Sequence, residues 1–167
     1  MRLDLRPILR TPGASLPFQF QLDLSGMDFY GAQPFAHPVR VSGAVRNMAG
    51  ALSLEGTAET TLELVCDRCL KPFSQDLALP VSTLLAEELE DEENDEIVLL
   101  QDGAADLDEI FTTALVLSMD AKHLCSEDCK GLCPTCGADL NLGPCQCRKE
   151  PDPRFAALAQ LLDKENE

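Results

Sequence analysis

Residues 125–147 read CSEDCKGLCPTCGADLNLGPCQC and contain six of the eight cysteines of the chain. Their spacing is C-x3-C-x3-C-x2-C-x8-C-x-C. The other two cysteines, Cys66 and Cys69, form a second C-x-x-C pair within VCDRCLK. Paired cysteines at these spacings are typical of structural metal sites. The cysteine-rich stretch therefore predicts a metal-binding module that the rest of the chain supports or contacts.

The pair formed by Cys133 and Cys136 lies in a Cys-Pro-Thr-Cys-Gly turn, which resembles the knuckle of rubredoxins and zinc ribbons. In such a turn two thiolates converge on one ion, and the glycine lets backbone N–H groups point toward sulfur. Zn²⁺ takes four ligands in a closed structural site, so eight thiolates would hold up to two ions. The predicted metal ligands are Cys66, Cys69, Cys125, Cys129, Cys133, Cys136, Cys145 and Cys147.

The spacing is compatible with two ways of dividing these cysteines. In the first, the two C-x-x-C pairs share one ion, and the remaining ligands are Cys125, Cys129, Cys145 and Cys147. In the second, a compact C-terminal set closes alone and consists of Cys133, Cys136, Cys145 and Cys147. We favour the local set because closing a short loop costs less entropy than closing one of about sixty residues.

Other roles for the cysteines fit less well. Structural disulfides need an oxidising compartment, and the opening residues, MRLDLRPILRTPG, show no secretory leader. The spacings differ from those of ferredoxin-type iron–sulfur proteins. A thioredoxin-like pair needs a strand-to-helix turn, whereas Pro72 and a strand-like run follow Cys69. His123 is expected to lie outside the coordination, because the thiolates already suffice.

Composition restricts the partners. The chain has 167 residues and a formal net charge of −16, with 13 basic and 29 acidic side chains. No apolar run approaches the ~18 residues that a membrane-spanning helix needs, so we expect a cytoplasmic protein that binds no membrane. Binding to phosphates requires clustered Lys and Arg, which disfavours DNA and makes direct RNA contact weak. A basic protein partner would instead be attracted.

Alternating apolar and polar residues predict a β-rich body. Strands are expected at residues 18–24, 39–45, 51–55, 57–65, 73–85 and 97–100, with Gly56 separating two of them and Pro80 interrupting another. The connections are too short for crossover helices, which predicts an antiparallel meander or small barrel. Asp106, Glu109 and the apolar positions after them predict a packing helix.

The fold class is therefore α+β, with four segments along the chain. Residues 1–86 form an antiparallel β body that carries the first cysteine pair, and residues 87–96 form an acidic linker. Residues 97–124 supply a strand and a helix that complete the body, and residues 125–167 hold the metal module and a C-terminal helix. The linker has eight acidic residues in ten positions, which is typical of a solvated loop and alternatively of a flexible segment that attracts a basic partner.

An ordered series of motifs resembles the bacterial YceD family. The motifs are CDRCL at 66–70, the acidic linker, CKGLCPTCG at 129–137, LN at 140–141, CQC at 145–147 and DPR at 152–154. Family members are described as large ribosomal RNA subunit accumulation proteins, with relatives in plastids. The resemblance covers the chain from about residue 60 to the end.

The resemblance implies a non-enzymatic factor for large ribosomal subunit biogenesis. Such a factor promotes accumulation or processing of large-subunit ribosomal RNA, and we expect it to act through a basic ribosomal protein or a pre-ribosomal particle. The alternative class is an enzyme, either a thiol redox protein or a zinc hydrolase. Catalytic zinc keeps an open position and usually draws on His or carboxylate, whereas this chain offers two His and a complete thiolate set. We therefore predict no catalytic residues.

Overall fold

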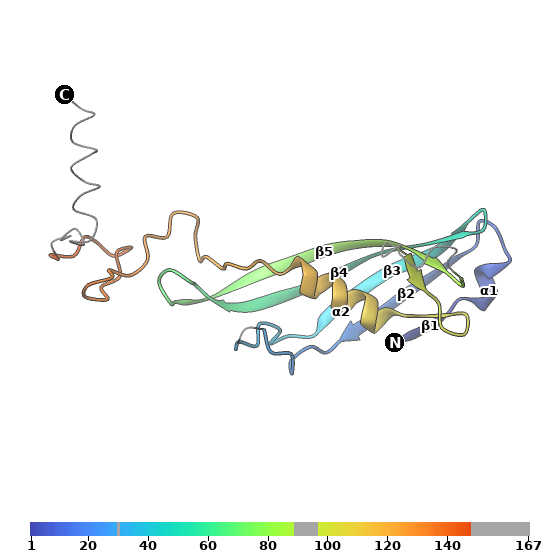
Figure 1. Ribbon diagram of the computed structural model, residues 1–167, viewed down its shortest axis with the longest axis horizontal. Coiled ribbons are helices and arrows are strands. Elements are labelled where there is room, and N and C mark those ends of the chain that lie inside the picture. The colour runs from blue at the N-terminus through green and yellow to red at the C-terminus, as the bar shows by residue number, and fades with distance from the viewer. Residues whose placement is uncertain (30, 89–96, 148–167) are drawn as a thin grey trace, which may run out of the picture.

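The computed structural model describes residues 1–29, 31–88 and 97–147. A long β-sheet forms the body, and helix α2 lies across one face of it (Figure 1). The elements are β1 (Arg2–Asp4), α1 (Arg6–Leu9), β2 (Ser15–Leu22), β3 (Val39–Met48), β4 (Ala51–Val65), β5 (Pro72–Ala86), β6 (Ile97–Leu99), β7 (Ala104–Asp106) and α2 (Leu107–Ser118). The predicted C-terminal helix and most of the acidic linker lie outside the described residues.

The main sheet has five strands in the order β2-β3-β4-β5-β6. The first four strands are antiparallel neighbours, as the predicted meander requires, whereas β6 pairs with β5 in parallel. Strands β1 and β7 form a separate two-stranded sheet. The alternative of a small barrel is wrong, because β2 and β6 end the sheet without pairing with each other. The described part of the chain is thus mostly β, with a mixed open sheet and short helices.

Gly56 and Pro80 do not interrupt the strands, contrary to the sequence-based expectation. Gly56 pairs with Gly43 across β3 and β4, and a Cβ added to Gly43 would lie 2.8 Å from the Phe18 ring. The two glycines therefore let the strands pass close beneath that ring. Pro80 lies where β5 pairs with β4 alone, since β6 reaches only Leu84, Leu85 and Ala86. A missing N–H is tolerated on such an edge.

Helix α2 begins as predicted. The Asp106 carboxylate accepts hydrogen bonds from the backbone N–H groups of Asp108 and Glu109, at 3.1 and 3.3 Å. Its buried face contains Leu107, Ile110, Phe111 and Leu115. The Phe111 ring contacts the rings of Phe18 and Phe20 edge-on, with centroids 5.9 and 6.2 Å apart. The core therefore lies between α2 and one face of the sheet. None of the helices in the described residues is long and apolar enough to cross a bilayer.

The hairpin of β4 and β5 extends beyond the rest of the sheet (Figure 1). Strand β4 pairs with β3 no further than Glu59, and its later residues pair with β5 alone. Leu62, Leu64 and Cys66 share one buried face, as their alternation predicts. Phe73 at the start of β5 packs against both the main core and the buried cysteines. The first C-x-x-C pair is thereby placed at the hairpin tip.

Candidate metal centres

The eight cysteine sulfurs form two groups of four. Within each group all Sγ atoms lie within 4.8 Å of one another. The first group combines the hairpin tip with the start of the cysteine-rich segment and contains Cys66, Cys69, Cys125 and Cys129. The second group is local and contains Cys133, Cys136, Cys145 and Cys147. The second group is the compact C-terminal set that loop-closure entropy favours, so the two C-x-x-C pairs do not share one ion site.

The sulfur spacing fits a tetrahedral ion. Four sulfurs at ~2.3 Å from Zn²⁺ lie ~3.8 Å from one another at the corners of a tetrahedron. The Sγ atoms of Cys66 and Cys129 are 3.8 Å apart, and those of Cys69 and Cys125 are 3.6 Å apart. Neither group includes a histidine or a carboxylate from the described residues. The two four-cysteine groups are therefore consistent with two metal sites.

The two C-x-x-C turns share one backbone geometry. The Gly137 N–H donates to the Cys133 carbonyl at 2.8 Å, and the Leu70 N–H donates to the Cys66 carbonyl at 2.8 Å. In each turn the N–H of the first cysteine also donates to the carbonyl five positions later, at 2.8 and 2.9 Å. Gly137 has φ 71° and Leu70 has φ 58°. Leu70 therefore adopts the left-handed conformation that glycine supplies in the second turn.

Ionisation of the sulfurs is unequal within each group. Backbone hydrogen bonding from Cys125 lowers the pKa of Cys66 to about 6, whereas the neighbouring Cys69 sulfur raises the pKa of Cys125 to about 12. In the second group, N–H groups of its own turn lower the pKa of Cys133 to about 6, and a neighbouring sulfur raises the pKa of Cys147 to about 12. Each group thus stabilises some thiolates and opposes others, and a bound divalent cation would remove that repulsion.

Asp67 and Arg68, the residues inside the first C-x-x-C turn, bind the C-terminal segment. The Asp67 N–H donates to the His123 carbonyl at 2.9 Å, and the His123 N–H donates to the Asp67 carboxylate at 2.6 Å. The Arg68 guanidinium donates to the Cys129 carbonyl at 2.8 Å, and the Arg68 carbonyl accepts from the Leu132 N–H at 3.0 Å. His123 thus contacts the turn through its backbone and, as expected, belongs to neither sulfur group.

The spacer of the second group contacts the first group. Lys71 pairs with the Asp139 carboxylate at 2.5 Å, and Asn141 donates from Nδ2 to the Cys129 sulfur at 3.5 Å. The Asn141 side-chain oxygen accepts from the Lys130 N–H at 2.8 Å. Sequence analysis did not predict these supporting residues. The signal was the presence of two polar residues, Asp139 and Asn141, in the eight-residue spacer between Cys136 and Cys145. The two sulfur groups are therefore linked by hydrogen bonds.

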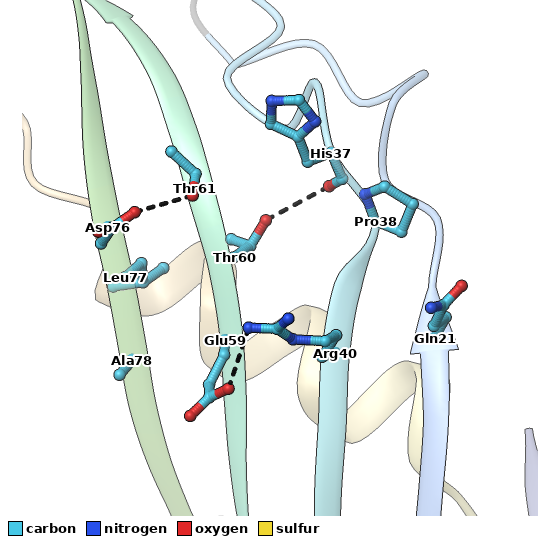
Figure 2. A pocket seen from close by; sticks show the side chains of 10 residues that line it. All are labelled: Gln21, His37, Pro38, Arg40, Glu59, Thr60, Thr61, Asp76, Leu77 and Ala78. Atoms are coloured by element: carbon cyan, nitrogen blue, oxygen red, sulfur yellow. Dashed lines mark hydrogen bonds and ion pairs between the residues drawn. The ribbon is translucent and has the colours of Figure 1, made fainter.

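A second candidate is a polar hollow of about 570 Å³ on the face of the sheet opposite α2 (Figure 2). Arg40 and Glu59 point toward each other across it, 3.4 Å apart, and Thr61 donates to Asp76 at 2.8 Å. Its charged side chains are exposed, and Arg40 and Glu59 form an ion pair. They provide neither a nucleophile paired with a base nor a further metal-ligand set among the described residues. We assign no site to this hollow.

Comparison with known proteins identifies the family. The family model described as "Large ribosomal RNA subunit accumulation protein YceD" matches residues 54–162. The chain belongs to the YceD family. This match includes all eight cysteines of the two sulfur groups. The family description names no catalysed reaction.

Individual relatives come from bacteria and plants. An uncharacterized protein of Mycobacterium tuberculosis is 28% identical over 179 residues, which cover 100% of this chain and 84% of the relative. The Zea mays "Large ribosomal RNA subunit accumulation protein YCED homolog 1, chloroplastic" is 34% identical over 161 residues, which cover 76% of this chain and 55% of the plant protein. No solved structure matches the chain.

Proposed function

We propose that this protein is a non-enzymatic factor for large ribosomal subunit biogenesis, and that it promotes accumulation or processing of large-subunit ribosomal RNA. Membership in the YceD family and the name of the Zea mays relative support this role. The net charge of −16 supports a basic ribosomal protein, within a pre-ribosomal particle, as the direct contact. Cytoplasmic location is part of the same proposal.

We further propose that the two sulfur groups hold Zn²⁺ ions with a structural role. The observation that carries this proposal is the pair of complete four-sulfur sets. Each would be closed, because four thiolates fill the tetrahedral coordination of Zn²⁺. A closed site leaves no position for water or substrate, which supports a structural role over a hydrolase. When bound, Zn²⁺ would neutralise part of the thiolate charge and fix the ligands in place.

The first group would join two distant parts of the chain. Cys66 and Cys69 lie at the hairpin tip, whereas Cys125 and Cys129 follow α2. Three of these four cysteines are buried, and Leu124 and Leu132 pack against them. Metal binding by the first group would therefore also stabilise the packing of the hairpin tip against the C-terminal segment.

The role in ribosome biogenesis is tested in cells that lack this protein. We expect the ratio of large-subunit to small-subunit ribosomal RNA to fall, and the intact chain to restore it. The protein should co-sediment with large-subunit precursors. Cys69→Ser should fail to restore the ratio, because it removes a ligand of the first group, whereas Leu142→Gln should succeed, because Leu142 is 84% exposed. An unchanged ratio in cells without the protein would exclude the proposed function.

Direct RNA recognition is tested separately. Arg40 is paired with Glu59 on the sheet, and Arg46 is exposed on the same strand. The other basic residues considered from the sequence, Arg148, Lys149 and Arg154, lie outside the described residues. Mobility-shift titrations with large-subunit RNA fragments should show only weak binding near physiological salt. Submicromolar binding that is abolished when Arg148, Lys149 and Arg154 become Ala would favour direct RNA recognition instead.

A further inference from the structure

An apolar groove of about 520 Å³ lies between α2 and the β5–β6 margin of the sheet. Its lining includes Val81, Val98, Leu99, Ala114 and Leu117. Leu117 is 80% exposed and Leu99 is 49% exposed. Large aliphatic side chains that are exposed together in a hollow are typical of an interaction site or a ligand-binding groove.

The groove is open because α2 and β6 cover this margin only in part. Phe111 packs against Phe18 and Phe20 of β2, at the opposite edge of the sheet from β6. Strand β6 has only three residues, and the five-stranded sheet ends there. The side of α2 that carries Leu117 therefore lines the groove, and within the described residues no strand of the main sheet lies beyond β6.

Acidic side chains lie in the groove and in a neighbouring hollow. Glu109 of α2 lines the groove itself. An adjoining hollow of about 530 Å³ is lined by Glu87, Glu88 and Asp102. Residues 99–102 contribute to both hollows: Leu99 and Gln101 line the groove, whereas Leu100 and Asp102 line the acidic hollow. In the sequence, the acidic run 87–96 begins directly after β5 and ends directly before β6.

Two of the basic side chains at this end of the molecule are already engaged. Arg6 makes two hydrogen bonds to the Asp4 carboxylate, at 2.8 and 2.6 Å. Arg2 donates to the Gln101 carbonyl at 3.2 Å. The linings of the groove and of the acidic hollow together contain four acidic side chains and no Lys or Arg, so the field there attracts positive charge.

We propose that this groove binds a basic amphipathic segment of a partner protein. Apolar side chains of the segment would enter between α2 and β6, and its Lys and Arg side chains would face Glu109 and the acidic hollow. The inference rests on the proposed function, because we take the partner protein to be the basic ribosomal protein proposed above. RNA is the less suitable occupant, because the acidic rim repels phosphates. The tail of the chain also fits less well, because residues 148–167 carry four basic and five acidic side chains.

The groove is tested with three synthetic peptides of about 18 residues each. One has Leu at helical spacing with Lys elsewhere, the second replaces Leu by Ser, and the third replaces Lys by Glu. The zinc-loaded full chain should bind the Leu/Lys peptide at least about ten-fold more tightly than the other two. The double variant Leu99→Gln, Leu117→Gln should weaken that binding about ten-fold, since it removes apolar contact without changing charge. Leu142→Gln, a matched exposed leucine outside the groove, should leave it unchanged.

Nuclear magnetic resonance then locates the peptide. Shift changes on adding the Leu/Lys peptide should concentrate in residues 98–102 and 109–117. Shift changes centred on the polar hollow of Figure 2 or on the cysteines would overturn the proposal. Equal affinity for the Leu/Lys peptide and for the peptide in which Ser replaces Leu would also overturn it. In the free chain, nuclear Overhauser contacts between Leu117 and residues 155–162 would show that the tail occupies the groove. A dimer that dissociates on Leu117→Gln would show that a second copy does, and either result would also overturn it.

Complementation separates failure of the groove from failure of the proposed function. In cells that lack the protein, the Leu99→Gln, Leu117→Gln variant should restore large-subunit ribosomal RNA poorly, whereas Leu142→Gln should restore it fully. Full restoration by the groove variant would overturn the groove proposal and leave the proposed function intact. If absence of the protein does not lower the RNA ratio, the proposed function fails, and the peptide titration alone decides whether the groove binds a basic segment.

Discussion

The side-chain amide of Asn141 lies 3.5 Å from the Cys129 sulfur, so the spacer of one cysteine group donates to a sulfur of the other. The Asn141 oxygen accepts from the Lys130 N–H, which follows Cys129 in the chain. Groups that donate to ligating atoms orient them and strengthen metal binding. Folding of the second group is thus expected to stabilise metal binding in the first.

This contact predicts the effect of Asn141→Ala. The variant should weaken zinc binding by the first group about ten-fold, because the Cys129 sulfur loses a donor. Competition with a chelator of known affinity measures the change. Leu142→Ala is the control, because it alters the neighbouring exposed side chain without touching a sulfur. Equal zinc affinity in Asn141→Ala and the unaltered chain would show that the Asn141 contact does not strengthen metal binding in the first group.

Leu70 predicts a stabilising substitution. Its φ of 58° is unfavourable for a residue with a Cβ, and its side chain is 64% exposed. Leu70→Gly should raise the free energy of unfolding of the zinc-loaded chain by up to about 1 kcal/mol, measured by chemical denaturation. Leu70→Ala keeps the Cβ and should leave stability nearly unchanged. A destabilised Leu70→Gly variant would mean that the exposed leucine makes a contact of its own.

The two groups should release metal at different rates. Three cysteines of the first group are buried, whereas in the second group only Cys133 is buried and Cys136 is exposed. A chelator should therefore remove zinc in two phases, the faster of which belongs to the second group. Stopped-flow absorbance of a chromogenic chelator measures the phases, and Cys136→Ser should abolish the fast one. Loss of the slow phase in that variant would reverse the assignment.

The acidic run should affect association more than folding. Replacing the eight acidic residues of 87–96 by Ser and Gln should shift the melting temperature by less than about 2 °C, since exposed charges contribute little to stability. Glu87 and Glu88, at its start, are exposed. Binding of a basic partner should weaken, and its dependence on salt should flatten. A fall in melting temperature of many degrees would show that the run is packed against the body.

Local patterns predicted much of the fold. Alternation identified the strands of the main sheet, and the Asp106 cap identified α2, because both signals lie within a few neighbouring residues. The predicted strand breaks at Gly56 and Pro80 were wrong, because whether a strand accepts these residues depends on its neighbours. Gly56 pairs with Gly43, and Pro80 lies on an edge that β6 does not reach. The parallel pairing of β6 with β5 and the antiparallel pairing of β1 with β7 join residues that are distant in the sequence, and no local pattern encodes such contacts.

The candidate site was predicted to a similar depth. The cysteines and their local grouping followed from spacing and loop entropy. The residues that support them did not, because Lys71 meets Asp139, and Arg68 meets the Cys129 carbonyl, only after the hairpin tip reaches the C-terminal segment. Leu70 was also unexpected, since a left-handed leucine carries no signal in composition.

The most direct test of two separate four-cysteine metal sites is a heteronuclear correlation spectrum of the chain loaded with ¹¹³Cd in place of zinc, which links each metal nucleus to the β-protons of its ligands. Two cadmium resonances are expected. One should correlate with Cys66, Cys69, Cys125 and Cys129, and the other with Cys133, Cys136, Cys145 and Cys147. A single resonance, or one cadmium that correlates with both C-x-x-C pairs, would contradict the account.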